Sequence, residues 1–130
     1  MFHVKQFGAG PVNNMVEDMR CVITARLFRE EKCFGPGIAE LLEGIEELKS
    51  LRAAMRMGMA YSKAWRIIHE CEEKLGFRLL YSSTGGRGGG GAKVTPEGKK
   101  LLSRFRTLEK ELNITADALL QAWREEDANL

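Results

Sequence analysis

The feature that most limits the fold of this chain is a run of six glycines and one arginine at residues 85–91. Glycine loses more conformational freedom on folding than any other residue, so the run does not continue a helix or a strand and predicts a flexible loop. Strand-compatible residues lie on both sides of it, at 79–84 and at 92–95. The pattern therefore predicts two short strands joined by a glycine-rich loop.

Three helical patterns precede these strands. The first follows the break at 35–37 and repeats apolar residues over 38–48, with glutamates on the opposite face. The second covers 50–57 with Ser50 as its N-cap, and the third covers 61–75 and ends at a glycine. Three helices followed by strand, loop and strand are the order of a winged helix-turn-helix domain. On the second and third helices the predicted inward positions are Leu51, Ala54, Met55, Ala64, Ile68, Cys71 and Leu75.

The N-terminal part predicts a short β-hairpin preceded by an arm. Residues 1–20 contain glycine, proline and asparagine without a period, which is typical of a flexible segment. From Cys21 to Leu27 apolar residues alternate with others, as in a half-buried strand. Residues 29–32 would turn the chain, and Cys33–Phe34 would return as a second strand.

A long helix is predicted after the second strand of the glycine-loop pair. Thr95, Pro96 and Glu97 are an N-cap, a proline at the first helical position and an acid in the first turn. Apolar residues then recur at spacings close to a heptad, over more turns than one small domain covers. We therefore expect two chains to pair along this stripe as a homodimer. The predicted interface residues are Leu101, Phe105, Leu108, Leu112, Leu119 and Trp123.

Charge is segregated along the chain although the net charge is only +2. Residues 51–100 carry ten Lys and Arg against four Asp and Glu, whereas 38–50 carry one Lys and four Glu. Positive charge gathered on one part of a nearly neutral chain favours an anionic partner, and nucleic acid is the usual one. The alternative is that these charges only solvate the surface and bind no partner. The candidate DNA-binding residues are Tyr61, Ser62, Lys63, Arg66, Thr84, Arg87, Gly88, Gly89 and Lys93.

Other classes of function lack support in the sequence. Three widely spaced cysteines form neither a disulfide framework nor a CxxC pair, which favours reduced thiols in the cytoplasm. There is no secretion signal and no apolar run of membrane-spanning length. No nucleophile stands at a recognisable spacing from a base, and no cluster of metal ligands occurs. We therefore expect no catalytic residues, no metal site, no cofactor and no membrane partner.

The glycine run also satisfies the pattern GxGxxG over residues 86–91, which in dinucleotide-binding proteins cradles a phosphate. In those proteins the glycines open a helix inside a βαβ unit, whereas here a short strand follows them. The context therefore argues against a nucleotide-binding enzyme. Arg87 and Lys93 near the glycines instead suit a backbone that approaches a sugar-phosphate chain, although a plain hairpin tip would have the same glycines.

The segments SLRAA, YSKAW, GGRGGGGA and VTPEG occur in this order between residues 35 and 102. With them, about half of the chain resembles the N-terminal DNA-binding domain of the ModE family of molybdate-responsive regulators. More distantly, residues 53–82 resemble LysR-type regulators. The resemblance implies a winged-helix fold, a dimer, and DNA contacts from the third helix and the wing. By position, these contacts would come from Ser62, Lys63, Arg66, Thr84, Arg87 and Lys93.

The sequence departs from this family at two points. The family usually has a serine where this chain has Ala60, so we expect the third helix to lack a side-chain cap. Full-length regulators of the family also carry molybdate-binding modules after this domain, and this sequence ends at Leu130. We therefore expect that this chain does not bind molybdate, and that it is a stand-alone DNA-binding subunit or receives its signal by another route.

The sequence as a whole predicts an α+β, mostly α fold: a winged helix-turn-helix with a short N-terminal β-hairpin and a long C-terminal dimerisation helix. The predicted divisions are a flexible arm at 1–20, a DNA-binding domain at 21–95 and the dimerisation helix at 96–126. The predicted function is that of a cytoplasmic, sequence-specific transcriptional regulator of the ModE-like type without the molybdate-binding module, which binds double-stranded DNA. The alternative is a winged-helix module that binds protein, for which acidic or apolar residues on the third helix and wing would have been expected.

Overall fold

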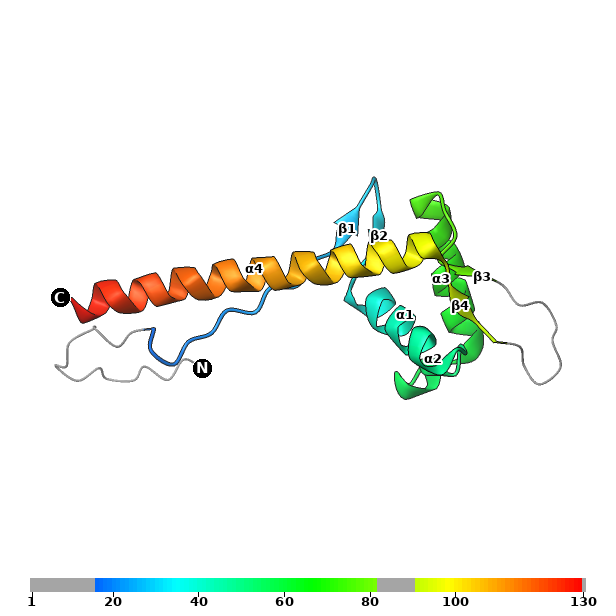
Figure 1. Ribbon diagram of the computed structural model, residues 1–130, viewed down its shortest axis with the longest axis horizontal. Coiled ribbons are helices and arrows are strands. Elements are labelled where there is room, and N and C mark those ends of the chain that lie inside the picture. The colour runs from blue at the N-terminus through cyan, green and yellow to red at the C-terminus, as the bar shows by residue number, and fades with distance from the viewer. Residues whose placement is uncertain (1–15, 82–90, 130) are drawn as a thin grey trace, which may run out of the picture. The chain divides into compact units, whose positions relative to one another are not determined.

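The computed structural model describes residues 16–81 and 91–129 (Figure 1). The chain forms two compact units, one of residues 24–109 and one of residues 1–23 with 110–130. Most of the predicted arm lies outside the described residues. The glycine-rich loop up to residue 90 also lies outside them, and so do four candidate DNA-binding residues, Thr84, Arg87, Gly88 and Gly89.

The first unit begins with an antiparallel hairpin of β1, Leu27–Phe28, and β2, Lys32–Phe34. The predicted strand from Cys21 is wrong up to residue 26, because β1 starts only at Leu27. The alternation itself is real, since Ile23 and Ala25 are half-buried and their neighbours are exposed. Pairing stays short because β2 is followed directly by a glycine and a proline, and proline has no N–H to extend a ladder.

Three helices follow the hairpin, α1 at Pro36–Leu48, α2 at Ala53–Arg56 and α3 at Tyr61–Leu75. α1 and α2 pack closely at Gly44, where an added Cβ would lie 2.7 Å from the Cβ of Ala53. α3 has the bounds that its periodicity predicts.

The second helix differs most from its prediction. Ser50 does not cap it, because the Ser50 hydroxyl accepts from the backbone N–H of Arg52 at 3.1 Å and the helix starts one residue later. Leu51 and Ala54 are buried as predicted, but Met55 was wrongly placed in the core and is 72% exposed. A single helical turn has room for few inward positions, and the alanines fill them.

The wing strands are β3, Leu80–Tyr81, and β4, Lys93–Val94, which pair antiparallel with Leu80 opposite Val94. The next residue, Thr95, ties this pair to α4, Pro96–Ala128. Its hydroxyl donates to the carbonyl of Arg78 at 2.6 Å and accepts from the N–H of Gly98 at 2.9 Å. Thr95 is therefore the N-cap that the sequence predicts, and it also fixes the base of the wing.

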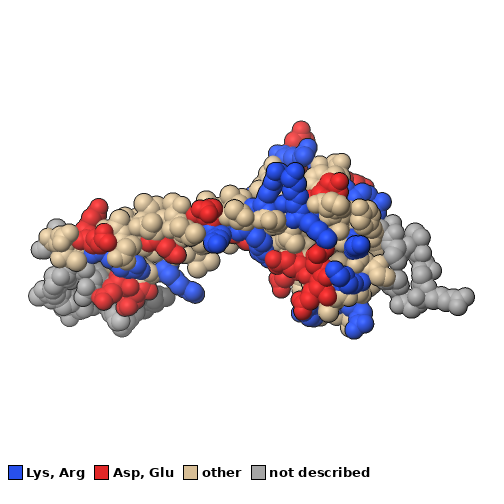
Figure 2. Space-filling model, viewed as in Figure 1, with Lys and Arg blue, Asp and Glu red and all other residues tan. Residues whose placement is uncertain are grey.

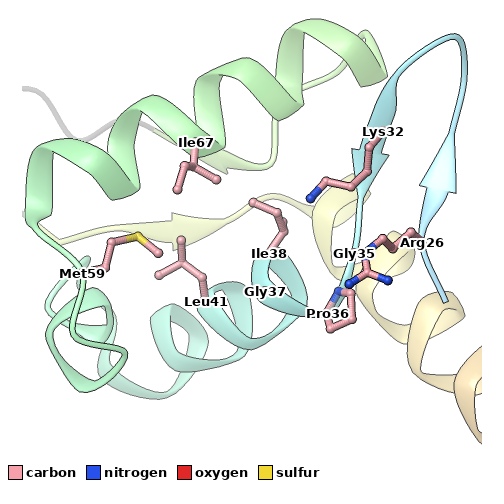
Figure 3. A pocket seen from close by; sticks show the side chains of 9 residues that line it. All are labelled: Arg26, Lys32, Gly35, Pro36, Gly37, Ile38, Leu41, Met59 and Ile67. Atoms are coloured by element: carbon pink, nitrogen blue, oxygen red, sulfur yellow. The ribbon is translucent and has the colours of Figure 1, made fainter. Parts of the chain in front are cut away.

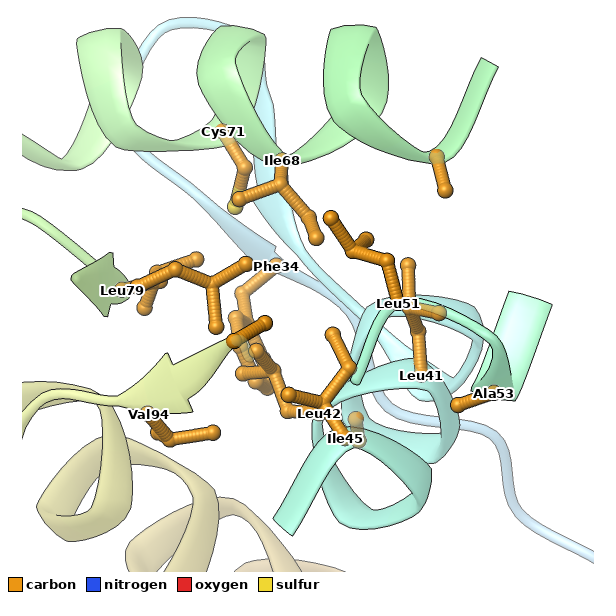
Figure 4. Close-up of a cluster of buried hydrophobic side chains, with 14 of the residues drawn as sticks. Phe34, Leu41, Leu42, Ile45, Leu51, Ala53, Ile68, Cys71, Leu79 and Val94 are labelled. Atoms are coloured by element: carbon orange, nitrogen blue, oxygen red, sulfur yellow. The ribbon is translucent and has the colours of Figure 1, made fainter. Parts of the chain in front are cut away.

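One hydrophobic core holds the hairpin, α1, α3, the wing strands and the start of α4 together (Figure 4). Phe34 and Phe105 are almost fully buried, and their rings meet edge to face with centroids 5.1 Å apart. The predicted stripe of α3 points into this core, from Ala64 to Leu75. The fold is thus the predicted winged helix-turn-helix, mostly α, with a short hairpin in front and a long helix behind.

In the second unit, the chain around Val16 packs on the later turns of α4. Val16 is 4% exposed, and Ala116 and Leu120 of α4 are also buried. The guanidinium of Arg124 donates to the backbone carbonyls of Val16 and Met19, at 3.3 and 2.6 Å. None of the helices in the described part of the chain has both the length and the apolar character of a membrane span.

Candidate nucleic-acid interface

The outer face of α3 carries four of the candidate DNA-binding residues. Helical spacing sets this face, because Ala64, Ile68 and Cys71 are held in the core on the opposite side. The four residues on the outer face are Tyr61, Ser62, Lys63 and Arg66, and all are exposed. The burial of one stripe thus fixes the rotation of α3 and aims the other stripe at solvent.

The acidic face of α1 is neutralised within the domain. Its glutamates pair with cations of α2 and α4: Glu47 with Arg56 at 3.3 Å, Glu46 with Lys99 at 3.7 Å and Glu43 with Arg106 at 2.6 Å. Figure 2 shows the acidic side chains gathered over α1 and basic ones over the β1–β2 hairpin. The cations of α2 and α4 that meet α1 are therefore already paired.

The cations of the candidate interface that the structure describes have no such partners. Lys63 and Arg66 on α3 and Lys93 on β4 form no ion pair with any residue that the structure describes. All three side chains are exposed. These side chains are therefore available to pair with an external anion, which is what a phosphate-binding surface requires.

The first turn of α3 adds backbone donors to this face. Its N-cap is Ala60, which has an extended backbone and provides no side-chain hydrogen bond, as the sequence predicts. The Ala60 carbonyl accepts the first intrahelical bond from the N–H of Ala64, at 3.0 Å. The N–H groups of the first three helical residues remain without a side-chain cap, at the end of the helix where the macrodipole favours anions.

An aromatic row runs along the same helix. The rings of Tyr61 and Trp65 meet edge to face with centroids 6.5 Å apart, and those of Trp65 and His69 stack with centroids 5.0 Å apart. Trp65 is half-buried. The spacing of four residues between members of the row was visible in the sequence and would have predicted it.

A buried carboxylate fixes the other end of α3, and sequence reasoning missed it. Glu72 is 9% exposed, and its Oε2 accepts from the backbone N–H groups of Leu79 and Leu80, at 2.6 and 3.1 Å. Its Oε1 lies 3.1 Å from Nδ1 of His69. Because Leu80 begins β3, this one side chain joins α3 to the wing. The only signal in the sequence was its position beside the inward stripe, next to Cys71.

The described residues contain no group of three or more side chains placed to hold a metal ion. Cys71 in the core is also a poor nucleophile. The thiol of Cys71 donates to the carbonyl of Cys33, and burial, with the nearby Cys33 and Glu72, raises its pKa to about 12. A thiol with such a pKa carries almost no thiolate near neutral pH.

The stripe predicted as a dimer interface on α4 is only partly covered within one chain. Phe105 is 1% exposed because it packs on Phe34 in the core. Leu101 and Leu112 are half-buried. By contrast, Leu108, Leu119 and Trp123 are 37%, 56% and 49% exposed.

Comparison with known proteins gives a family match to residues 40–99, the bacterial regulatory helix-turn-helix proteins of the lysR family. The molybdenum-pterin-binding protein MopB of Rhodobacter capsulatus is 32% identical over 94 residues, 72% of this chain and 35% of that protein. The molybdenum transport protein ModE of Herbaspirillum seropedicae is 35% identical over 71 residues, 54% of this chain and 26% of that protein.

A third relative is the DNA-binding transcriptional dual regulator ModE of Escherichia coli K12, which is 30% identical over 105 residues. The match covers 76% of this chain and 40% of that regulator. The chain thus spans between about a quarter and two fifths of the length of these curated relatives. The resemblance to the ModE family that the sequence motifs predict is confirmed for the stretch of these relatives that the chain matches.

Proposed function

We propose that this protein is a transcriptional regulator that binds duplex DNA as a homodimer, and the match of residues 40–99 to the bacterial regulatory helix-turn-helix proteins of the lysR family supports this proposal. The observation that carries the proposal is that Lys63 and Arg66, in and next to the uncapped first turn of α3, form no ion pair with a residue that the structure describes. α3 is the second helix of the helix-turn-helix, the one that enters the major groove in such domains. No enzymatic activity is part of the proposal.

The two candidate DNA-binding cations of α3, Arg66 and Lys63, have different roles in this proposal. Arg66 lies one turn into the helix and offers a planar fork that suits the O6 and N7 atoms of guanine. Lys63 lies in the first turn, beside the uncapped N–H groups, where a phosphate is the natural ligand. On β4, Lys93 contacts the sugar-phosphate backbone, together with Arg87 of the wing.

Selection from a pool of random duplexes tests this division of roles. We expect the wild-type protein to enrich one sequence motif, and Arg66→Ala to relax the preference at one or two base pairs, by about 1–3 kcal/mol each. Lys93→Ala and Arg87→Ala weaken all duplexes about equally and leave the motif unchanged. Failure to enrich any motif would contradict sequence-specific binding, and the same enrichment profile for Arg66→Ala and Lys93→Ala would contradict the division.

The proposed dimer forms along the exposed stripe of α4. Leu108, Leu119 and Trp123 lie within about one sixth of the helix circumference at 100° per residue, with Leu112 between them. Phe105 is not part of the interface, because it is already in the core of its own chain. A symmetric pair would set two recognition helices about 34 Å, or a multiple of this, apart on a palindromic site.

A matched pair of variants on α4 tests the dimer. Leu119 and Ile114 are both apolar, 56% and 50% exposed, and lie on opposite sides of the helix. We expect Leu119→Glu to sediment as a folded monomer with weaker binding to palindromic DNA, while Ile114→Glu stays dimeric. A Leu119→Glu protein that remains a dimer would place the interface elsewhere.

The molybdenum-related names of the relatives support a place for this regulator in molybdate-responsive control. We expect the 130-residue chain itself not to bind molybdate with micromolar affinity. Calorimetric titration of the protein with molybdate checks this, and saturable heat with a micromolar Kd would show that the chain itself senses the oxyanion.

A further inference from the structure

A pocket of about 250 Å³ lies between the β1–β2 hairpin, the beginning of α1, and α3 (Figure 3). Its apolar wall is formed by Ile38 and Leu41 of α1, Met59 of the turn between α2 and α3, and Ile67 of α3. Leu41 is buried and the other three side chains are half-buried. All of these residues belong to one compact unit, so the pocket is a feature of the winged-helix domain itself.

The other side of the pocket is cationic. Lys32 of β2 and Arg26, just before β1, line it, and no acidic residue does. In Figure 3 the ammonium group of Lys32 points toward the space between α1 and α3, and the Arg26 guanidinium lies beside Gly35 and Pro36. Neither side chain forms an ion pair or a hydrogen bond with a residue that the structure describes. The pocket thus has two unpaired cations on one side and apolar side chains on the other.

The pocket has room at its edge for a ligand to approach the backbone. Gly37 lines it, and a Cβ added there would meet no atom within 4 Å. The neighbouring N-cap, Gly35, supplies no side-chain hydrogen bond to the first turn of α1. The accessible backbone at Gly37 is therefore a third feature of the pocket, beside the two cations and the apolar wall.

From this arrangement we propose that the pocket binds a small carboxylate with an apolar body. A neutral apolar molecule would leave both cations unneutralised, and an inorganic oxyanion would leave the apolar wall without a partner. At about 250 Å³ the pocket is slightly smaller than typical ligand pockets of about 300–1,000 Å³, so the ligand has roughly the size of benzoate or 3-methylbutanoate.

The position of the pocket links its ligand to DNA binding, a step that rests on the proposed function. Met59 lies in the turn of the helix-turn-helix, and Ile67 follows Arg66 directly on α3. A ligand that contacts both side chains acts on the part of the fold that sets the position of α3. By linkage, the ligand and DNA then change each other's affinity by the same factor.

Titration calorimetry of the full chain without DNA tests the site, with benzoate and 3-methylbutanoate as probes. Benzamide is the neutral control of the same shape, and sulfate is the anion without an apolar body. We expect both carboxylates to bind, and benzamide and sulfate to bind at least about tenfold more weakly. Absence of carboxylate binding at about 10 mM, or equal binding of benzoate and either control, would overturn the proposal.

Variants of exposed cations locate the site without touching the core. Arg26→Gln with Lys32→Gln should lower benzoate affinity at least about tenfold. Arg29→Gln, the same change on the same hairpin but outside the pocket, should leave it within about twofold. If the pocket variant and Arg29→Gln lost the same benzoate affinity, the effect would come from the overall charge of the protein, and the assignment of benzoate to this pocket would be overturned. All three side chains are exposed, so the proteins should keep the wild-type Tm.

A second titration, of duplex DNA with and without benzoate, tests the linkage separately. We expect the affinity for DNA to change in the wild type and not in the Arg26→Gln, Lys32→Gln protein. Binding of benzoate without any effect on DNA affinity would overturn the linkage alone. A chain that binds benzoate but no duplex would overturn the proposed function, while the pocket assignment would stand.

Discussion

Replacing Glu72 by alanine should destabilise this domain more than any other removal of one charged side chain on α3. The carboxylate accepts two backbone N–H groups, from Leu79 at 2.6 Å and Leu80 at 3.1 Å, and both residues are buried. The side chain that joins them to α3 is itself 9% exposed. In Glu72→Ala no other described acceptor is in place for either N–H, so both lose their partner in a dry environment.

The expected loss follows from these two contacts. A buried donor left without a partner costs about 1–3 kcal/mol, and a hydrogen bond to a charged group contributes about 1.5–3 kcal/mol. For two N–H groups, the free energy of unfolding should fall by about 3–5 kcal/mol. Glu72→Gln keeps one acceptor oxygen for the same N–H groups and should lose less, about 1–2 kcal/mol.

Urea denaturation followed by circular dichroism measures this difference, with Glu73→Ala as the control. Glu73 is the next residue on α3 and is exposed, so its removal should change the free energy of unfolding by no more than about 0.5 kcal/mol. If Glu72→Ala lost less than about 1 kcal/mol, or no more than Glu73→Ala, the idea that this carboxylate joins α3 to the wing would be refuted.

Three further predictions concern the packing and charges of the same domain. Arg106 donates two hydrogen bonds to Glu43 and so lowers the pKa of the Glu43 carboxyl. The ion pair therefore stabilises the fold above pH 4.5, the ordinary pKa of the carboxyl, and this stabilisation is lost as pH falls through the lowered pKa. In Arg106→Ala the free energy of unfolding at pH 7 should fall by about 1 kcal/mol, because the pair is partly exposed, and this deficit in urea denaturation should shrink as pH falls below 4.5; a deficit independent of pH would contradict this. With a thiol reagent at pH 8, the exposed Cys21 should react fast and the buried Cys33 and Cys71 only on unfolding. Fast reaction of two or more thiols in the folded protein would argue against the buried pair. At Gly98 a Cβ would lie 2.9 Å from the carbonyl oxygen of Leu79, so Gly98→Ala should lower stability by about 1–3 kcal/mol. Gly37→Ala, where a Cβ meets no atom within 4 Å, should not, and equal effects of the two would show that close packing at Gly98 is unimportant.

The long periodic elements were predictable because their patterns are strong and local. α3 has the expected bounds because its apolar stripe, its first residue and the glycine that ends it agree with one another. The start of α4 was equally clear, since Thr95 and Pro96 both favour it. At Ala60 the absence of a cap could be predicted from one residue.

The errors lie where tertiary contacts decide. The alternation from Cys21 predicted a strand, but a strand needs a partner, and β2 is only three residues long. Met55 fitted a helical stripe, yet α2 is a single turn whose alanines face the core. Glu72 was missed because nothing in a local pattern shows that a carboxylate will meet the N–H groups of residues seven and eight positions later.

The central claim, that the outer face of α3 binds DNA phosphates, is tested most directly by the salt dependence of duplex binding. Fluorescence anisotropy over about 50–200 mM KCl should give a slope of log K against log salt near −5, for a dimer with about six phosphate contacts. Lys63→Gln removes one contact per chain and should reduce the slope by about 2. The control Lys110→Gln, an equal change at an exposed residue of α4, should leave it unchanged. A flat salt response, or the same slope for Lys63→Gln and Lys110→Gln, would contradict the account.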